Sequence, residues 1–479
     1  MTHIENLTPL DAAMPRTYIK VLLVFDGASS ASPAQQSVTQ TLQEGLDKLV
    51  KKVPWLSGRV FSAQGNKGLE TRYEEGGRPL LLDKGAVTAT ATDGTPAQVW
   101  PVLESAFEDG APVFAASVFR FAPSPVPGDH AGENPSQGIG LCVCMHHSAV
   151  DATGFTEIIK LWAENVKNRS VAFPSGPEVT PRHVQLSEAL SPDLQDFRST
   201  TPSRESLLAQ HPEYSTTPPA PPTAFHSHSL FPPCTSKPFT ISINWLNTLK
   251  ELLQKHTSTK KPPSTNTLLC ALLWTTITRA RSRRDPSLLS KTTSRLVTAV
   301  NGRSRLELKE PNEHAYLGNT VLYALTPYPA ADLASSTSDA DPEPDVYPRR
   351  ALAAICDRIS EAQGPCTINR RHIAGVYALH ENVSPVFPGW DLFGSRDVVV
   401  TSWADQDLYG VDFGEGLGSP NAVKFPATEK GPFADGVVAV LPRQRGEGEA
   451  ERIEVLVMLR EDDMAALEGD SLWQTLVSW

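Results

Sequence analysis

A buried strand that leads directly into an amphipathic helix, within Leu141–Lys167, constrains the fold of this chain more than any other stretch. It begins Leu-Cys-Val-Cys-Met, an apolar run too short for a helix and typical of a strand buried on both faces. From Phe155 to Val166 the apolar residues recur at helical spacing, which predicts an amphipathic helix. Side chains at such a junction are held rigidly and can still reach a cleft.

Two histidines, His146 and His147, follow the strand, and Asp151 comes four residues after the second. An imidazole titrates near neutral pH and can act as a general base when its orientation is fixed. A histidine pair at the end of a buried strand also suits a purely structural role, and the spacing His-x-x-x-Asp arises easily by chance. This segment alone therefore leaves the catalytic and the structural interpretation open.

Length and charge exclude several classes of protein. A chain of 479 residues predicts two domains of about 200 residues each, because single hydrophobic cores seldom grow larger. No run approaches the roughly 18 apolar residues that span a bilayer. The net charge of −11 argues against a general binder of nucleic acid or of anionic membranes, whose surface should be basic. Small molecules are therefore the expected partners. The chain is also expected to be a monomer.

The six cysteines are scattered and lie mostly in apolar contexts, which predicts free thiols in a reducing compartment. Cys142 and Cys144 alternate along one strand and lack the wider spacing of zinc-binding cysteine pairs, so no metal is expected. No secretory signal is visible at the N-terminus and no targeting motif at the C-terminus, which favours a cytoplasmic location.

Strand and helix patterns alternate along the chain and indicate a mixed α/β fold. The predicted strands are 16–26, 113–121, 138–145, 296–300, 397–403, 436–442 and 453–459, and the predicted helices are 36–53, 241–254 and 265–280. Proline is dense over 196–238, which predicts a crossover linker between two domains. A second irregular insert is expected at 329–348, and the Pro- and Gly-rich stretch before residue 138 reads as a surface loop.

The pair of motifs HHSAVD (His146–Asp151) and DFGEG (Asp412–Gly416) resembles the paired signature of the BAHD-type acyl-CoA-dependent acyltransferases, in both order and wide separation. The resemblance spans nearly the whole chain and is strongest to fungal secondary-metabolite O-acetyltransferases such as trichothecene 3-O-acetyltransferases. Four further segments follow the family order, namely Leu7–Asp11, Ser264–Asn266, Asn301–Arg303 with Tyr316–Asn319, and Thr401–Trp403.

The resemblance implies an α/β fold with mixed sheets, in which two chloramphenicol-acetyltransferase-like domains enclose a central solvent channel. The expected domains are 1–195, which carries HHSAVD, and 239–479, which carries DFGEG. Residues near 400–425 are expected to pack into the first domain. The implied reaction transfers an acyl group, acetyl by preference, from acyl-CoA to a hydroxyl in a ternary complex. Acyl-CoA is then a co-substrate, and no cofactor is bound permanently.

The resemblance also assigns roles to individual residues. His147 is the expected general base, because a hydroxyl attacks a thioester only when its proton is removed. Thr401 and Trp403 are expected to line the oxyanion position, although a strand end with a core tryptophan would look the same. Asp151 is expected to pair with Arg303 and shape the catalytic loop, and His146 to pack beside it.

Asp412 and Gly414 are expected to support the channel from a distance. Glu415 departs from the family, where tryptophan is common, and this leaves a role of the motif toward CoA in doubt. For the phosphates of CoA the candidates are the segment with Lys260, Lys261, Ser264 and Thr265 and the cluster Arg279, Arg281, Arg283 and Arg284, and the first is favoured. A basic run at a helix end also complements the helix dipole without any ligand.

Two other functions remain open from the sequence. A stand-alone condensation-type domain would take its acyl group from a carrier protein, but the DFG motif and the lack of a carrier domain favour CoA. A catalytically inactive binding protein of the same fold is the other, and the presence of His147, Thr401 and Trp403 argues against it.

Overall fold

The computed structural model describes residues 1–26, 37–63, 68–88, 97–103, 109–121, 138–168, 181–218, 232–290, 292–308, 315–335, 347–391, 395–426, 435–445 and 452–477. The chain divides into two compact units. The first consists of Met1–Pro192, Leu306–Thr320 and Gln406–Pro426, and the second of Asp193–Arg305, Val321–Asp405 and Ala427–Trp479. Two segments from the second half of the chain thus belong to the first unit.

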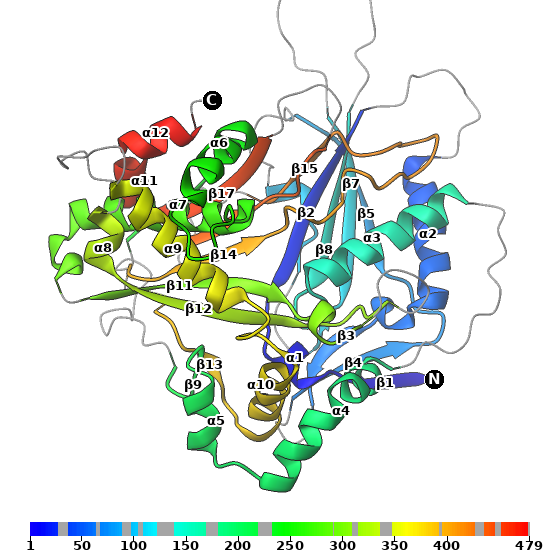
Figure 1. The fold of residues 1–479 in the computed structure, drawn as a ribbon. Helices are drawn as coiled ribbons and strands as arrows, with labels where there is room; N and C mark the ends of the chain where they lie inside the picture. Colours follow the sequence, from blue (N-terminus) through cyan, green and yellow to red (C-terminus); the bar gives the residue numbers. More distant parts are fainter. Residues whose placement is uncertain are drawn as a thin grey trace, which may run out of the picture. The chain divides into compact units, whose positions relative to one another are not determined.

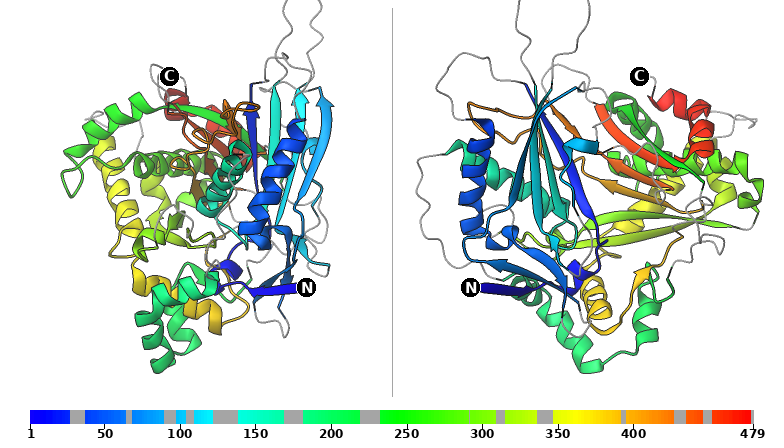
Figure 2. Two further views of the ribbon diagram at one scale, coloured as in Figure 1. Left: turned by 90° about the vertical axis from the view of Figure 1, so that its right-hand side faces the viewer. Right: turned by 180° about the vertical axis from the view of Figure 1, so that it is seen from behind.

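A five-stranded sheet forms the centre of the first unit and has β8 in its middle (Figure 1). Its strands, in spatial order, are β15 (Ala422–Lys424), β2 (Tyr18–Phe25), β8 (Ile139–His146), β7 (Phe114–Phe121) and β5 (Leu80–Val87). Only the β5–β7 pair is parallel. Every residue of β8 is buried, as the continuous apolar run predicted. Figure 2 shows β2, β7 and β8 side by side from behind.

A smaller antiparallel sheet and the first helices complete this unit. The sheet contains β1 (Thr2–Asn6), β4 (Leu69–Glu74), β3 (Arg59–Ser62) and β6 (Ala111–Pro112) in that order. The helical segments are α1 (Pro9–Ala12), α2 (Val38–Lys52), η1 (Pro54–Ser57), η3 (Ala97–Val99), α3 (Ala152–Lys167) and the start of α4 (Arg182–Thr200). α2 packs against α3, where the indole N–H of Trp162 donates to the carbonyl of Leu42 at 2.9 Å.

The second unit is built on a six-stranded mixed sheet. Its strands, in spatial order, are β10 (Cys234–Ser242), β17 (Arg452–Arg460), β16 (Val437–Val440), β14 (Val398–Ser402), β11 (Thr293–Asn301) and β12 (Val321–Pro329). The β11–β14 and β14–β16 pairs are parallel, and the others are antiparallel. A two-stranded ribbon of β9 (Tyr214–Ser215) and β13 (Phe387–Pro388) belongs to the same unit.

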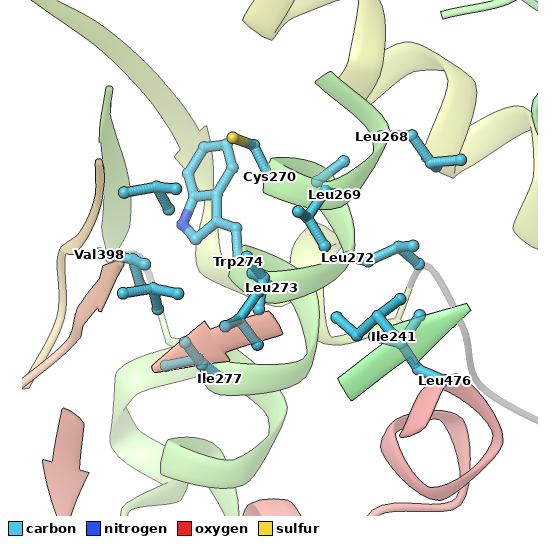
Figure 3. Close-up of a cluster of buried hydrophobic side chains, with 14 of the residues drawn as sticks. Ile241, Leu268, Leu269, Cys270, Leu272, Leu273, Trp274, Ile277, Val398 and Leu476 are labelled. Atoms are coloured by element: carbon cyan, nitrogen blue, oxygen red, sulfur yellow. The ribbon is translucent and has the colours of Figure 1, made fainter. Parts of the chain in front are cut away.

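Helix α7 (Thr265–Arg284) is the central helix of the second unit and is buried on nearly all sides (Figure 3). Leu268, Leu272 and Trp274 pack among residues of the sheet and of neighbouring helices. The other helical segments of this unit are α5 (Arg204–Gln210), α6 (Ile243–Gln254), η4 (Pro286–Leu289), η5 (Arg303–Arg305), α8 (Ala330–Ser335), α9 (Tyr347–Gln363), α10 (Arg370–Asn382), α11 (Glu461–Glu468) and α12 (Ser471–Val477).

Every predicted strand and helix overlaps an element of the same type, but two predictions of irregular structure are wrong in part. The expected linker over 196–238 includes the end of α4, all of α5 and the start of β10, and the chain passes between units inside α4. The expected insert over 329–348 begins with α8 and ends in α9. Alanine-rich sequence favours α8, and Leu333 on it is buried. Residues 122–137, expected to form a loop, lie outside the described residues.

Helices α9 and α10 were missed by the sequence analysis, although α9 carries buried Leu352, Ile355, Cys356 and Ile359 at helical spacing. Within the described parts of the chain, none of the helices combines the length and the apolar character that crossing a membrane requires.

Candidate functional site

The HHSAVD segment forms a tight loop between β8 and α3, as the change of hydrophobic period predicted. His146 ends the strand, and its carbonyl accepts hydrogen bonds from the backbone N–H groups of Ala149 at 2.8 Å and Val150 at 3.3 Å. The ring of His146 is fully buried and meets Tyr18 edge to face. Burial lowers the pKa of His146 to about 4, with smaller effects from His147 and Arg16, so this imidazole is neutral at neutral pH.

The main chain of His147 is fixed on both sides. Its N–H donates to the carbonyl of Thr17 at 2.8 Å, and its carbonyl accepts from the side-chain amide of Asn319 at 3.0 Å. Burial lowers the pKa of His147 below its ordinary value of 6.5, and the nearby Asp151 carboxylate partly opposes this shift. The imidazole is therefore neutral at neutral pH, which is the form that can accept a proton.

Asp151 is the N-cap of α3 and is almost completely buried. One carboxylate oxygen accepts from the backbone N–H of Gly154 at 2.9 Å, and the other accepts from the backbone N–H of Thr320 at 3.0 Å. A Cβ atom at Gly154 would collide with the carbonyl oxygen of Leu317, so glycine lets the first turn of α3 approach this segment. Asp151 thus ties α3 to residues that come much later in the chain.

Asn319 and Asp11 form a second layer of support behind the loop. The Asp11 carboxylate accepts from the backbone and side-chain N–H groups of Asn319, both at 2.8 Å, and from the backbone N–H and hydroxyl of Thr8, both at 2.9 Å. Burial raises the pKa of Asp11, and Arg182 and these hydrogen bonds act against the rise. The amide that holds the His147 carbonyl is itself oriented by a buried carboxyl group.

A buried arginine holds the other side of the loop. Nη1 of Arg182 donates to the carbonyl of Ala149 at 2.7 Å, and Nε pairs with Glu5 at 3.1 Å. The guanidinium lies over the ring of Trp55, 4.2 Å from its centroid. Thr17, Arg182 and Asn319, which are far from one another in sequence, therefore all hold the HHSAVD backbone.

The DFG segment lies in the first unit, at the C-terminal end of α3. Asp412 pairs with Lys167 at 2.7 Å and accepts from the backbone N–H of Gly414 at 2.8 Å. The hydrogen bond and charge of Lys167 lower the pKa of Asp412. Phe413 is buried and meets Phe25 and Trp162 edge to face. Gly414 has φ of +82°, a backbone conformation that favours glycine.

Thr401 and Trp403 lie at the end of β14 in the second unit. Thr401 is opposite Ala439 on the parallel strand β16, and the N–H of Trp403 donates to the carbonyl of Val440 at 2.9 Å. Trp403 is buried, whereas Thr401 is partly exposed.

Arg303 also belongs to the second unit, in η5 just after β11. It is buried, and its backbone N–H and Nη1 donate to the side-chain oxygen of Asn301 at 3.0 and 3.3 Å. Its pairing with Asp151 stays a prediction. The same holds for a single site that joins His147 with Thr401 and Trp403, because these residues lie in different units.

The segment proposed for CoA precedes α7 in the second unit. Ser264 is the N-cap of α7, and its hydroxyl accepts from the backbone N–H of Thr267 at 3.0 Å. Lys260 and Lys261 are exposed, and Nζ of Lys250 on α6 donates to the hydroxyl of Thr265 at 3.1 Å. Lys250 thus reaches the N-terminus of α7, whereas Nζ of Lys260 donates to the carbonyl of Lys255 at 3.0 Å. Lys250 was missed by the sequence analysis.

The arginines at the other end of α7 are engaged with carboxylates. Arg279 and Arg283 pair with Asp470 at 3.1 and 2.9 Å, and Arg284 pairs with Asp463 at 2.7 Å. These contacts complement the C-terminal end of the helix and make the cluster a poor candidate for phosphate binding.

The six cysteines are free, and Cys366 alone among them is exposed. Cys142 and Cys144 lie on one face of β8 in an apolar cluster with Leu22, Val24 and Phe119. Burial raises the pKa of Cys144 to about 12, with Lys20 acting weakly against it. Both thiols are protonated core residues, as the alternation along the strand predicted.

Two family models match the chain. The model described as Transferase family matches residues 135–472, and the model described as Trichothecene 3-O-acetyltransferase-like N-terminal domain matches residues 17–75. Together they cover both motifs.

Curated relatives match over nearly their full length. The chain is 27% identical to the O-acetyltransferase ptmV of Penicillium ochrochloron, over 98% of this chain and 95% of the relative. It is 25% identical to the trichothecene 8-O-acetyltransferase of Fusarium sporotrichioides, over 98% and 97%. Among solved structures, TRI101 of F. sporotrichioides with coenzyme A and T-2 superimposes with a TM-score of 0.69 at 20% identity, covering 98% of both chains. That likeness identifies the two-domain acyltransferase fold expected from the sequence.

Proposed function

The chain belongs to the Transferase family, and we propose that it transfers an acetyl group from acetyl-CoA to a hydroxyl of a small secondary metabolite. The observation that carries this proposal is the neutral imidazole of His147, held at the rigid end of β8 within the family motif. The names of the full-length relatives, which are O-acetyltransferases, support the donor and the acceptor class.

His147 is the proposed general base. Its Nδ1 is buried, and the ring interacts with the backbone of His147 itself and of Val150, so we assign proton transfer to Nε2. The imidazole takes the proton of the acceptor hydroxyl while the oxygen attacks the thioester carbonyl. Collapse of the tetrahedral intermediate breaks the C–S bond, and the proton on His147 passes to the departing CoA thiolate. No covalent acyl-enzyme is required.

The developing oxyanion is assigned to Thr401 and Trp403. The parallel pairing of β14 with β16 and the backbone hydrogen bond of Trp403 support a rigid strand end, which suits donors that must be oriented before the reaction. The loss of one oxyanion donor typically costs about 100- to 1,000-fold in rate.

Four residues are proposed to support the site without touching substrate. Asp151 shapes the HHSAVD loop, and Arg303 shapes the segment that follows β11 in the second unit. Asp412 and Gly414 hold the DFG segment against α3. The dense hydrogen bonding around Asp151 supports this assignment, because a buried carboxylate needs such partners.

The phosphates of CoA are assigned to Lys260, Lys261, Ser264 and Thr265, and we add Lys250 because its Nζ donates to the hydroxyl of Thr265. Phosphate is stabilised near helix N-termini and by ammonium groups, and both are present here. An acidic protein of net charge −11 needs such a local basic patch to attract CoA.

The remaining parts of the proposal concern organisation. We assign the two compact units to the two acyltransferase domains. The protein is a cytoplasmic monomer without nucleic-acid or membrane partners. Its free cysteines and net negative charge support this assignment.

A thiol-release assay tests the function directly. Purified protein is mixed with acetyl-CoA and a panel of alcohols that includes T-2 and deoxynivalenol, the ligands named for TRI101 complexes. A blank without acceptor corrects for exposed Cys366. Acceptor-dependent release of CoA and an acetylated product are expected. No release with any acceptor, together with acylation from a carrier protein, would instead identify a condensation-type enzyme.

A further inference from the structure

Two histidines and a glutamate form a buried cluster in the second unit, outside the proposed acyl-transfer residues. His211 follows α5, Glu213 precedes β9, and His372 lies in the first turn of α10. His211 is 2% exposed, Glu213 is 3% exposed, and His372 is partly buried. The acyl-transfer mechanism uses none of them, and the sequence analysis expected no metal site here.

The three side chains bring one possible metal-binding atom each close to the others. Nδ1 of His211 lies 3.1 Å from Oε1 of Glu213, and Nε2 of His372 lies 3.3 Å from the same oxygen. All three atoms lie within 4.8 Å of one another. Ligands bound to zinc at about 2.0–2.2 Å in tetrahedral geometry are about 3.3–3.6 Å apart. The two shorter spacings are therefore close to the edges of a zinc coordination shell.

A hydrogen-bonded cluster without metal explains this arrangement less completely. His211 and Glu213 satisfy each other at 3.1 Å. Nε2 of His372 is buried and lies 3.3 Å from the same carboxylate oxygen, but it is poorly aligned for a hydrogen bond with it. A poorly aligned contact is weaker than a good hydrogen bond, and a metal ion at this point would use the lone pair of that nitrogen.

The surroundings restrict water and hold the ligands in place. The ring of His211 meets that of His372 at 4.8 Å, and Tyr214 beside them meets His380 edge to face at 4.8 Å. A Cβ atom at Gly375 would collide with Nε2 of His211, so glycine permits the close approach of α10. α5 packs against α10, and both lie near the β9–β13 ribbon (Figure 1).

We propose that His211, Glu213 and His372 bind a Zn²⁺ ion that ties the connection between α5 and β9 to α10. Two imidazoles and one carboxylate suit zinc, whereas magnesium and calcium prefer oxygen ligands. The protein supplies three ligands, and a water molecule completes the tetrahedron. The site joins segments that are far apart in sequence, so zinc binding stabilises the folded chain.

Metal binding is measured on the full-length protein after chelator treatment and dialysis. Zinc chloride is then titrated, and metal content is read by mass spectrometry alongside the unfolding temperature. One zinc per chain and a rise in unfolding temperature are expected. Cobalt substitution should give the absorption of a nitrogen- and oxygen-ligated ion without the charge-transfer band of a thiolate, which separates this site from the cysteines.

Two variants and one control assign the site. Glu213→Gln keeps the size of the side chain and removes its charge, and His372→Gln alters the least buried ligand; each should weaken zinc binding at least about tenfold, since even outer-shell changes cost that much. His183→Ala replaces an exposed histidine on α4 and should bind zinc like the unaltered protein. The proposal is overturned if the unaltered protein takes up no zinc, or if Glu213→Gln binds it with unchanged affinity.

Discussion

Two aspartates of the family motifs lie at opposite ends of α3 and are held in different ways. Asp151 caps the N-terminal end, is 1% exposed and accepts two backbone hydrogen bonds. Asp412 contacts the C-terminal end through Lys167, and its side chain is 42% exposed. One helix thus connects the HHSAVD loop to the DFG segment, through a buried carboxylate at one end and a surface ion pair at the other.

The difference shows that a shared motif residue does not imply a shared physical role. A buried carboxylate with two backbone donors stabilises a fixed loop, because its loss leaves those donors unsatisfied. An exposed ion pair contributes little, because water and salt screen it. The N-terminal end of α3, next to the loop that carries His147, is accordingly held more rigidly than the C-terminal end next to Asp412. The predictions below separate chemistry, rigidity and surface charge in that order.

The largest expected effect is on rate, at His147. His147→Ala removes the proposed base and should lower kcat about 100- to 10,000-fold, while the unfolding temperature stays near that of the unaltered protein. Stopped assays of acetylated product and a thermal melt measure the two quantities. His183→Ala serves as the matched control. If His147→Ala retained most of the rate, the proposed mechanism would be wrong.

The second effect is on stability, at Asp151. Asp151→Ala removes the cap of α3 and leaves the N–H groups of Gly154 and Thr320 without their acceptor, so the free energy of unfolding should fall by about 2–4 kcal/mol. Urea denaturation measures it. Asp151→Asn keeps one accepting oxygen, so its free energy of unfolding should lie between those of Asp151→Ala and the unaltered protein. Equal stability of Asp151→Ala and the unaltered protein would contradict the structural role.

The third effect links the two residues through pH. Since burial holds the pKa of His147 below 6.5, the base form persists in mildly acidic solution, and kcat/KM should fall only as pH drops through that lowered pKa. The Asp151 charge raises the pKa of His147, so Asp151→Asn should move the acid limb to still lower pH. A midpoint above 7, or an unshifted limb in Asp151→Asn, would argue against this coupling.

The sequence was sufficient for most of the fold that surrounds His147. The run from Leu141 to Met145 fixed a buried strand, and the apolar spacing after Phe155 fixed α3, because both signals are local periodicities. Resemblance supplied the role of the motifs, which no periodicity can give.

The supports of the loop could not be read in the same way. Arg182 and Asn319 hold carbonyls of the HHSAVD segment from distant positions, and Lys250 reaches Thr265 from another helix. Such pairs depend on how the chain returns in space, which a single sequence does not encode locally. The cluster of His211, Glu213 and His372 escaped notice for the same reason, since it joins residues across α5 and α10.

The smallest expected effect is at the exposed end of α3. Asp412→Ala removes the pair with Lys167 and the acceptor of the Gly414 N–H but leaves Phe413 buried against Phe25 and Trp162, so the unfolding temperature should change by less than about 3 °C. High salt should reduce this difference, because it screens the exposed pair with Lys167. Melts at low and high ionic strength, with Asp151→Ala in parallel, measure it. A loss at Asp412 as large as that at Asp151, and insensitive to salt, would mean that the DFG segment is held by its charge rather than by Phe413.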